Sequence, residues 1–337
     1  MNIYMQRIFF LPLILISLFV SVSVVSAQDS LIPVKNNRFG IHILDESDLP
    51  DAASLVNSSG GSWGYVTFVI REDEMDIGRW TNAFNQMKDL KLIPIVRIAT
   101  IQRNGVWEKP NYDNAEKWAT FLGSLPWPTT ARYVVLFNEP NHAKEWGGKI
   151  EPDEYAKMTR RYWEELKKNS FDFFVLPAGM DAAASNGNET ENSKNFFDDM
   201  AAFDPLIFTL FDGWTSHSYP NPDFSGSPSE NGKMSIRGFE WEVNYLSKYH
   251  LPTNSPVFIT ETGWKNNGRD QEQIAQNYKQ AFSEAWNNPN VVAVTPFLLR
   301  YDAKPFSAFS WKIPGTNTYY PYYSQVLGIS KVAGEPK

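Results

Sequence analysis

Two glutamates stand directly after short apolar runs of the kind that form buried strands. Residues 134–140 read VVLFNEP and residues 257–264 read VFITETGW, which places Glu139 and Glu261 at the ends of these runs. Glutamate is rarely buried unless it is paired or functional. Cleavage of a glycosidic bond needs two carboxyl groups, one that protonates the leaving oxygen and one that is ionised beside the developing oxocarbenium ion. We therefore interpret Glu139 and Glu261 as a candidate catalytic pair, although either one alone could be a turn or surface residue.

Other charged or titratable residues end apolar runs. Arg97 lies at the end of the run 92–98, Arg71 follows the run 64–70, and His42 lies in the run 39–44. A cation beside an ionised carboxylate lowers the pKa of that carboxyl group. Each arginine could equally form an ordinary ion pair at the ends of the strands. A single histidine is more often a structural hydrogen-bond donor, and for His42 we also consider contact with a sugar hydroxyl.

Eight apolar runs alternate with amphipathic stretches along the chain. The runs cover residues 39–44, 64–70, 92–98, 133–137, 173–176, 213–216, 257–260 and 291–299, and the run at 213–216 is the weakest. They are continuous rather than alternating, which is typical of parallel strands buried on both faces. The stretches between them predict a helix that begins at Pro152, helices near 79–90, 112–124, 193–203, 236–249 and 270–286, and a weaker one near 48–57.

Eight strands, each followed by a helix, predict an α/β fold, a single (β/α)8 barrel. The alternative is an open doubly wound sheet, which usually carries a glycine-rich phosphate turn after the first strand. Residues 40–43, GIHI, are not such a turn. Catalytic side chains of a barrel lie at the carboxyl ends of its strands. The two glutamates are therefore predicted to meet at the mouth of the barrel, after the fourth and seventh strands.

The pattern Asn138-Glu139-Pro140 after the fourth strand and Glu261 after the seventh resembles the signature of glycoside hydrolase clan A. This clan includes cellulase-like, mannanase-like and xylosidase-like families. The resemblance covers the mature chain in layout but only short motifs in sequence, so it assigns no family within the clan. Residues 260–264, TETGW, also resemble plant and fungal β-1,3-glucanases of the clan, which usually lack the proline after the acid/base glutamate.

The resemblance implies a retaining double displacement that uses no metal or organic cofactor. Glu261 would be the nucleophile and Glu139 the acid/base. Asn138 would hold the 2-hydroxyl of the sugar. His217 or Tyr219, in the segment 213–220 (GWTSHSYP), would form a hydrogen bond with the nucleophile and keep it ionised.

The resemblance also implies an aromatic platform under the reacting sugar. Many clan members carry tryptophan at the end of strand eight for this purpose. Residues 295–302 read TPFLLRYD and contain no tryptophan. The expected substitute is either Trp311, which follows the eighth strand after a short loop, or Trp264, which follows the seventh strand.

Composition excludes several classes of protein. The formal net charge is −7, which argues against binding of a nucleic-acid backbone. The chain has no cysteine, so thiol catalysis and cysteine-ligated metals are excluded. A metal-dependent barrel hydrolase is a further alternative. Such barrels typically carry His-x-His at the first strand, where this chain has only His42, one of four histidines.

The first 27 residues have the features of an export signal. Arg7 supplies a positive charge, residues 8–25 are almost entirely apolar, and residues 25–27 (VSA) are suited to cleavage. An uncleaved membrane anchor is the alternative, because roughly 20 apolar residues can span a bilayer. We therefore predict that residues 28–337 form the catalytic domain of a secreted or cell-surface protein, which contacts a membrane only through such an anchor.

The expected partner is a polysaccharide or oligosaccharide cut at internal bonds. The loops after strands three to six are long and carry Trp107, Trp127 and Trp146, which favours an open cleft for a polymer. The sequence does not distinguish β-glucan, β-mannan, xylan and galactan. Two other functions are compatible with the same features. One is a barrel that binds carbohydrate without cutting it, and the other is a transglycosylase that passes the sugar to another sugar.

Overall fold

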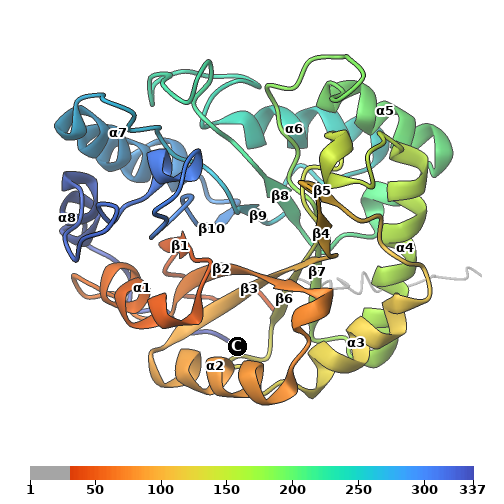
Figure 1. The fold of residues 1–337 in the computed structure, drawn as a ribbon, viewed down its shortest axis with the longest axis horizontal. Coiled ribbons are helices and arrows are strands. Elements are labelled where there is room, and N and C mark those ends of the chain that lie inside the picture. Colours follow the sequence, from red (N-terminus) through yellow and green to blue (C-terminus); the bar gives the residue numbers. More distant parts are fainter. Residues whose placement is uncertain (1–30) are drawn as a thin grey trace, which may run out of the picture.

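The computed structural model describes residues 31–337, and the predicted export signal at residues 1–27 lies outside this range. Parallel strands form the centre of the molecule and helices surround them (Figure 1). The eight predicted strands are all present, as β1 (Gly40–His42), β2 (Gly64–Arg71), β3 (Leu92–Ala99), β6 (Arg132–Leu136), β7 (Phe173–Pro177), β8 (Trp214–Ser216), β9 (Val257–Ile259) and β10 (Val291–Val294). The prediction of a (β/α)8 barrel is confirmed.

The barrel closes along two seams between a five-stranded sheet, β1-β2-β3-β6-β7, and a three-stranded sheet, β10-β9-β8. At the first seam, a parallel bridge joins Phe39, just before β1, to Val294, at the end of β10. At the second seam, the backbone N–H of Asp212 donates to the carbonyl of Val175 in β7 at 3.0 Å. A further parallel bridge between Asp181 and His217 continues this seam beyond the strands.

The predicted helices between the strands are also present. They are α1 (Leu49–Val56), α2 (Ile77–Asp89), α3 (Asn114–Ser124), α4 (Pro152–Asn169), α5 (Ser193–Phe203), α6 (Gly238–Leu246) and α7 (Gln271–Ser283). The predicted stretches 236–249 and 270–286 each end in a separate 3-10 turn, η5 (Ser247–Tyr249) and η6 (Ala285–Asn287). Other 3-10 turns are η1 (Glu46–Asp48), η2 (Glu72–Glu74), η3 (Ala143–Glu145), η4 (Ile207–Thr209) and η7 (Phe306–Phe309).

Apart from the 3-10 turns, two strands and one α-helix were not predicted from the sequence. The strands β4 (Gln102–Arg103) and β5 (Val106–Trp107) form an antiparallel hairpin in the loop after β3, and α8 (Pro321–Leu327) packs beside α1 and α7. The eighth run also ends earlier than expected, at Val294 rather than Leu299. Pro296 has no N–H to donate to a sheet, so the regular strand ends before it. Residues 297–299 still form backbone hydrogen bonds with both neighbouring segments, from Phe297 to Thr262 and from Leu299 to His42.

Alternate residues of each strand point into the barrel, as the twofold period of a strand requires. In β3, Ile93 and Ile95 belong to the cluster that fills the barrel interior, and Arg97 is the next inward position. The interior is apolar away from the carboxyl ends of the strands, and there the ring centroids of Tyr133 and Phe258 lie 5.0 Å apart. The inward positions at the carboxyl ends of the strands are polar, and the site is built from them.

The amino-terminal ends of the strands are covered by both ends of the described chain. Lys337 accepts a hydrogen bond from the N–H of Thr130 at 2.5 Å, and the N–H of Glu335 donates to the carbonyl of Lys35 at 2.9 Å. Among residues 31–337, none of the helices combines the length and apolar character needed to cross a membrane.

Candidate active site

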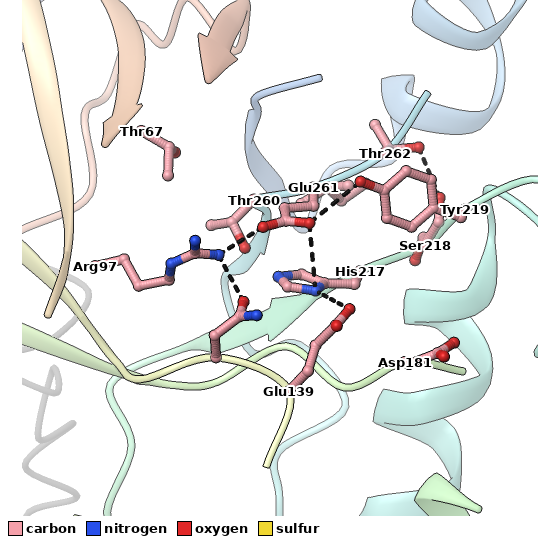
Figure 2. Close-up of polar contacts among 12 residues, drawn as sticks. Thr67, Arg97, Glu139, Asp181, His217, Ser218, Tyr219, Thr260, Glu261 and Thr262 are labelled. Atoms are coloured by element: carbon pink, nitrogen blue, oxygen red, sulfur yellow. Dashed lines mark hydrogen bonds and ion pairs between the residues drawn. The ribbon is translucent and has the colours of Figure 1, made fainter. Parts of the chain in front are cut away.

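Six of the predicted site residues meet at the mouth of the barrel (Figure 2). Arg97, Asn138, Glu139, His217, Tyr219 and Glu261 form one connected set of hydrogen bonds and ion pairs. They come from the ends of four strands, β3, β6, β8 and β9. Arg97 and Glu261, from the first and last of these strands, are 164 residues apart in the chain and meet only because parallel strands end on the same rim.

Glu261 is buried and surrounded by donors. Its side chain is 11% exposed. Arg97 Nη1 lies 2.5 Å from Oε1, and the Tyr219 hydroxyl donates to Oε2 at 3.2 Å. Burial alone raises the pKa of Glu261, but the charges of His217 and Arg97 outweigh this effect and hold the pKa at about 2. Glu261 is therefore ionised at neutral pH, as a nucleophile must be.

His217 lies between the two glutamates. Its Nδ1 is 2.9 Å from Glu139 Oε1 and 3.9 Å from Glu261 Oε2. Burial alone lowers the pKa of His217, but the charges of Glu261 and Glu139 outweigh it, so the pKa is raised. One oxygen of Glu139 and one of Glu261 lie within 4.8 Å of each other and of this ring. The two carboxyl groups thus have the close spacing of a retaining pair, which is about 5–5.5 Å, rather than the 6.5–9.5 Å or so of an inverting pair.

The backbone around the proposed acid/base is strained. Phe137 and Glu139 both have positive φ values, 73° and 31°. Non-glycine residues adopt this conformation at a cost and do so mostly where function or packing demands it. Both residues follow the end of β6, and the N–H of Glu139 donates to the carbonyl of Gly179 after β7 at 3.2 Å, so the chain turns toward the neighbouring strand there. Asn138 between them accepts from Arg97 Nη1 at 2.6 Å, so its amide lies beside the proposed nucleophile.

His42 lies in the floor of the site. It has no exposed surface, and its ring contacts Phe297 edge-on at 5.2 Å between centroids. Burial, together with the charge of Arg97, lowers the pKa of His42 to about 3, so the ring is neutral. Within residues 31–337, neither ring nitrogen has a hydrogen-bond partner of acceptable geometry. Because both ring nitrogens are enclosed, the structure does not support the expected contact of His42 with a sugar hydroxyl.

The expected tryptophan platform is wrong. Trp264 is 3% exposed and donates from its ring N–H to the carbonyl of Gly226, and Trp311 has no exposed surface and packs against Tyr278. A ring enclosed on both faces cannot stack on a sugar. Phe297, after β10, is the aromatic residue beside His42 instead. Phe297 was not predicted from the sequence as a site residue, because tryptophan is the residue expected at this place.

Two of the three loop tryptophans are also part of the core. Trp146 is fully buried against Phe137 and Tyr155, and Trp127 packs edge-on against Phe84 and Phe173. Trp107 in β5 is half-buried, and its carbonyl accepts from the N–H of Gly147. Of the three tryptophans expected to line an open cleft, Trp107 is thus the one that does not pack into or against the core.

Several residues around Glu139 were not singled out from the sequence. His142 Nε2 pairs with Asp181 Oδ2 at 2.8 Å, and Gly179 packs directly against the ring of His217. A third carboxyl group, that of Glu145, accepts from Asn138 Nδ2 at 3.2 Å. All of them lie in loops without periodic patterning, where the sequence carries no signal that separates them from surface residues.

The described residues offer one set of three possible metal ligands with ligand atoms this close, Glu139, His217 and Glu261. The donor set does not favour a cation. The Arg97 guanidinium already supplies positive charge at Glu261, and the raised pKa of His217 favours a protonated ring, which cannot ligate. These three side chains fit an acid/base site better than a metal site.

The fold and this site define a class of protein, the (β/α)8-barrel glycoside hydrolases. The chain belongs to the glycosyl hydrolase catalytic core family, whose family model matches residues 99–310. That match includes both glutamates. A comparison with curated protein sequences finds no match.

Solved structures of clan A enzymes share the fold. A family 39 glycoside hydrolase from Bacteroides cellulosilyticus WH2 is 14% identical with a TM-score of 0.61, and the match covers 88% of this chain and 64% of that one. XacCel5A in complex with cellopentaose is 13% identical with a TM-score of 0.55, covering 87% and 98%. The mannanase catalytic domain from Streptomyces sp. SirexAA-E is 13% identical with a TM-score of 0.53, covering 88% and 89%. The chain thus spans less than two thirds of the family 39 protein.

Proposed function

We propose that this glycoside hydrolase cleaves β-glycosidic bonds with retention, using Glu261 as the nucleophile and Glu139 as the acid/base. The observation that carries the proposal is the close spacing of the two carboxylates, whose nearest ligand atoms lie within 4.8 Å. This spacing leaves no room for a water molecule between the sugar and Glu261, as an inverting reaction would require.

The surroundings of the two glutamates match two different roles. Glu261 is ionised and held by Arg97 and Tyr219, so it can attack the anomeric carbon. Glu139 is more exposed, at 19% of its side chain, and its contact with His217 Nδ1 offers a proton within 2.9 Å. A general acid must be reprotonated in every cycle, which suits the more accessible carboxyl group.

The reaction balances in two steps. In the first, Glu139 protonates the glycosidic oxygen, the C1–O bond breaks, and a C1–O bond to Glu261 forms. In the second, Glu139 takes a proton from water, the oxygen of that water bonds to C1, and the bond to Glu261 breaks. Asn138 holds the 2-hydroxyl in both steps. A hydrogen bond to the 2-hydroxyl strengthens in the transition state.

We further propose that the substrate is a β-linked polysaccharide cut at internal bonds and that the protein is exported through residues 1–27. The half-buried Trp107 in the loop after β3 and the cellopentaose in the complex with XacCel5A support a polymeric substrate. The apolar run at residues 8–25 supports export. Residues 28–337 would then be the mature catalytic domain.

The test is the release of reducing ends by residues 28–337 from β-glucan, β-mannan, xylan and galactan, beside the Glu261→Ala variant. We expect activity on one polymer that falls by several orders of magnitude in the variant. Products of mixed length would support internal cleavage, whereas single sugars alone would contradict it. An excess of EDTA should leave the rate unchanged, because no step uses a metal.

Stereochemistry decides the mechanism. Proton NMR of the first product formed should show the β-anomer, and a 2-deoxy-2-fluoro glycoside with a good leaving group should label the peptide that contains Glu261. Fluorine at C2 disfavours the oxocarbenium-like transition state, so the glycosyl-enzyme accumulates. An α-anomer as first product, or a label on another residue, would sink the proposal.

A further inference from the structure

A third carboxyl group lies beside the proposed catalytic pair and takes no part in the mechanism above. Glu145 ends the 3-10 turn η3, and its side chain is only 11% exposed. The cation nearest to it, Lys144, is 57% exposed and 4.0 Å away, which makes a weak surface contact. A carboxylate buried this far needs a better reason than a solvated lysine.

That reason is the amide of Asn138. Its Oδ1 accepts from Arg97 Nη1 at 2.6 Å, and its Nδ2 donates to Glu145 Oε2 at 3.2 Å. The two ends of the amide are thus bound by opposite charges. With Arg97 on the oxygen and Glu145 on the nitrogen, the amide cannot turn over without placing like partners against each other.

The turn that carries Glu145 is itself tied to the rim. The N–H of Ala143 donates to the carbonyl of Glu189 at 2.9 Å, and the N–H of Gly147 donates to the carbonyl of Trp107 at 2.8 Å. Trp146, the residue after Glu145, is fully buried. The two backbone partners come from different loops and Trp146 fixes the turn in the core, so the carboxylate of Glu145 has a defined position relative to Asn138.

We propose that Glu145 is a positioning residue, which fixes the Asn138 amide so that its second N–H points at the 2-hydroxyl of the reacting sugar. Glu145 does not touch the substrate. The inference rests on the proposed function, because the 2-hydroxyl contact of Asn138 belongs to it. Glu145 acts through that contact alone, so its effect should vanish with a substrate that has no 2-hydroxyl.

The contact itself can be tested without activity. In protein labelled with 15N-asparagine, the side-chain amide signal of Asn138 is assigned by its loss in Asn138→Asp. We expect this signal to shift as pH moves through the titration of Glu145, whose pKa burial and the charge of Glu139 raise. The shift should be absent in Glu145→Gln. A signal that titrates equally in both proteins would overturn the proposal.

The role is tested with an aryl β-glycoside of the sugar that the wild type releases and with its 2-deoxy analogue. Glu145→Leu should lower kcat/KM about tenfold on the parent glycoside, because a misaligned donor loses transition-state stabilisation. It should have little effect on the 2-deoxy analogue. Glu145→Gln keeps an acceptor for Asn138 and should stay near wild type on both. Asn138→Ala should show the same pattern with a larger loss, about 100-fold.

Equal losses of Glu145→Leu on both substrates, with an unchanged Tm, would assign Glu145 another role and reject the proposal. No loss on either substrate would also reject it. Failure of the proposed function has a different signature, namely full activity in Glu261→Ala. In that case the amide titration still decides whether Glu145 fixes Asn138. If Glu145→Leu does not fold, Glu145→Gln with the amide titration decides alone.

Discussion

Arg97 supplies the positive charge that keeps Glu261 ionised in a buried setting. Its Nη1 contacts both Glu261 and Asn138. Arg71, which ends the neighbouring strand, pairs instead with Asp73 and Glu74 and is 40% exposed. The parallel register pairs Arg97 with Val69 and Arg71 with Ala99, so Arg71 lies one inward position farther along the rim than Arg97 and does not reach Glu261.

Arg97→Met should move the acid limb of kcat/KM upward by about 1–3 pH units, because an opposite charge at contact distance lowers a carboxyl pKa by that amount. The rate requires ionised Glu261, so it falls as pH drops through the pKa, which Arg97 helps to hold at about 2. Arg71→Met is the matched control and should leave the limb in place. A pH profile of Arg97→Met that coincides with that of the control would contradict this account.

The same pairing affects stability. The pKa of Glu261 is lower in the folded chain than its ordinary value of 4.5. A depressed pKa stabilises the folded state above the ordinary value and loses this contribution as pH falls toward the depressed one. The difference in Tm between wild type and Arg97→Met should therefore be larger at pH 7 than at pH 3.

At the scale of elements, the end of β7 positions both the acid/base and the histidine beside it. Gly179 follows this strand. Its carbonyl accepts from the N–H of Glu139 at 3.2 Å. A Cβ atom at Gly179 would lie 2.2 Å from Cδ2 and 2.7 Å from Nε2 of His217. The ring cannot retreat easily, since it is buried and bonded to Glu139.

Gly179→Ala should therefore displace His217 and lower kcat/KM by about 100-fold, the cost of misplacing a catalytic group by about 1 Å. Overpacking should also cost roughly 1–3 kcal/mol of stability. Gly187→Ala, in the same loop, has nothing within 4 Å of the added Cβ and should match wild type in both respects. Unaltered kinetics of Gly179→Ala would show that the ring of His217 is free to move.

At the scale of the whole molecule, the candidate catalytic residues and the contacts of the chain's last residues occupy opposite ends of the barrel. The last residues of the chain bind the amino-terminal ends of the strands: the N–H of Gly334 donates to the carbonyl of Ser62, and Thr130 donates to Lys337. Ser62 precedes β2 and Thr130 precedes β6. Both contacts lie a strand's length below the glutamates.

Removal of residues 332–337 should lower the free energy of unfolding by about 2–4 kcal/mol, because a handful of backbone hydrogen bonds of about 1 kcal/mol each are lost. The kcat/KM of the folded enzyme should not change. Glu335→Gln, which removes only the exposed ion pair with Lys35, should change stability by less than about 1 kcal/mol. Urea unfolding and kinetics on the same preparations check this, and reduced kcat/KM in the shortened chain would refute the separation.

The sequence by itself determined the order of the strands along the chain, and therefore which residues lie together with the two glutamates. Parallel strands must end on one rim, so Arg97, Glu139 and Glu261 could be placed together before any distance was known. Only the tertiary structure decided which rings are platforms and which are core. Trp264 and Trp311 follow strands just as the glutamates do. An aromatic side chain can lie in the core or line a sugar site, and only the packing around it determines which of the two it does. The tertiary structure also decided the role of Glu145. Its loop has no hydrophobic periodicity from which the orientation of the side chain could be predicted, and its role depends on contacts between residues distant in sequence.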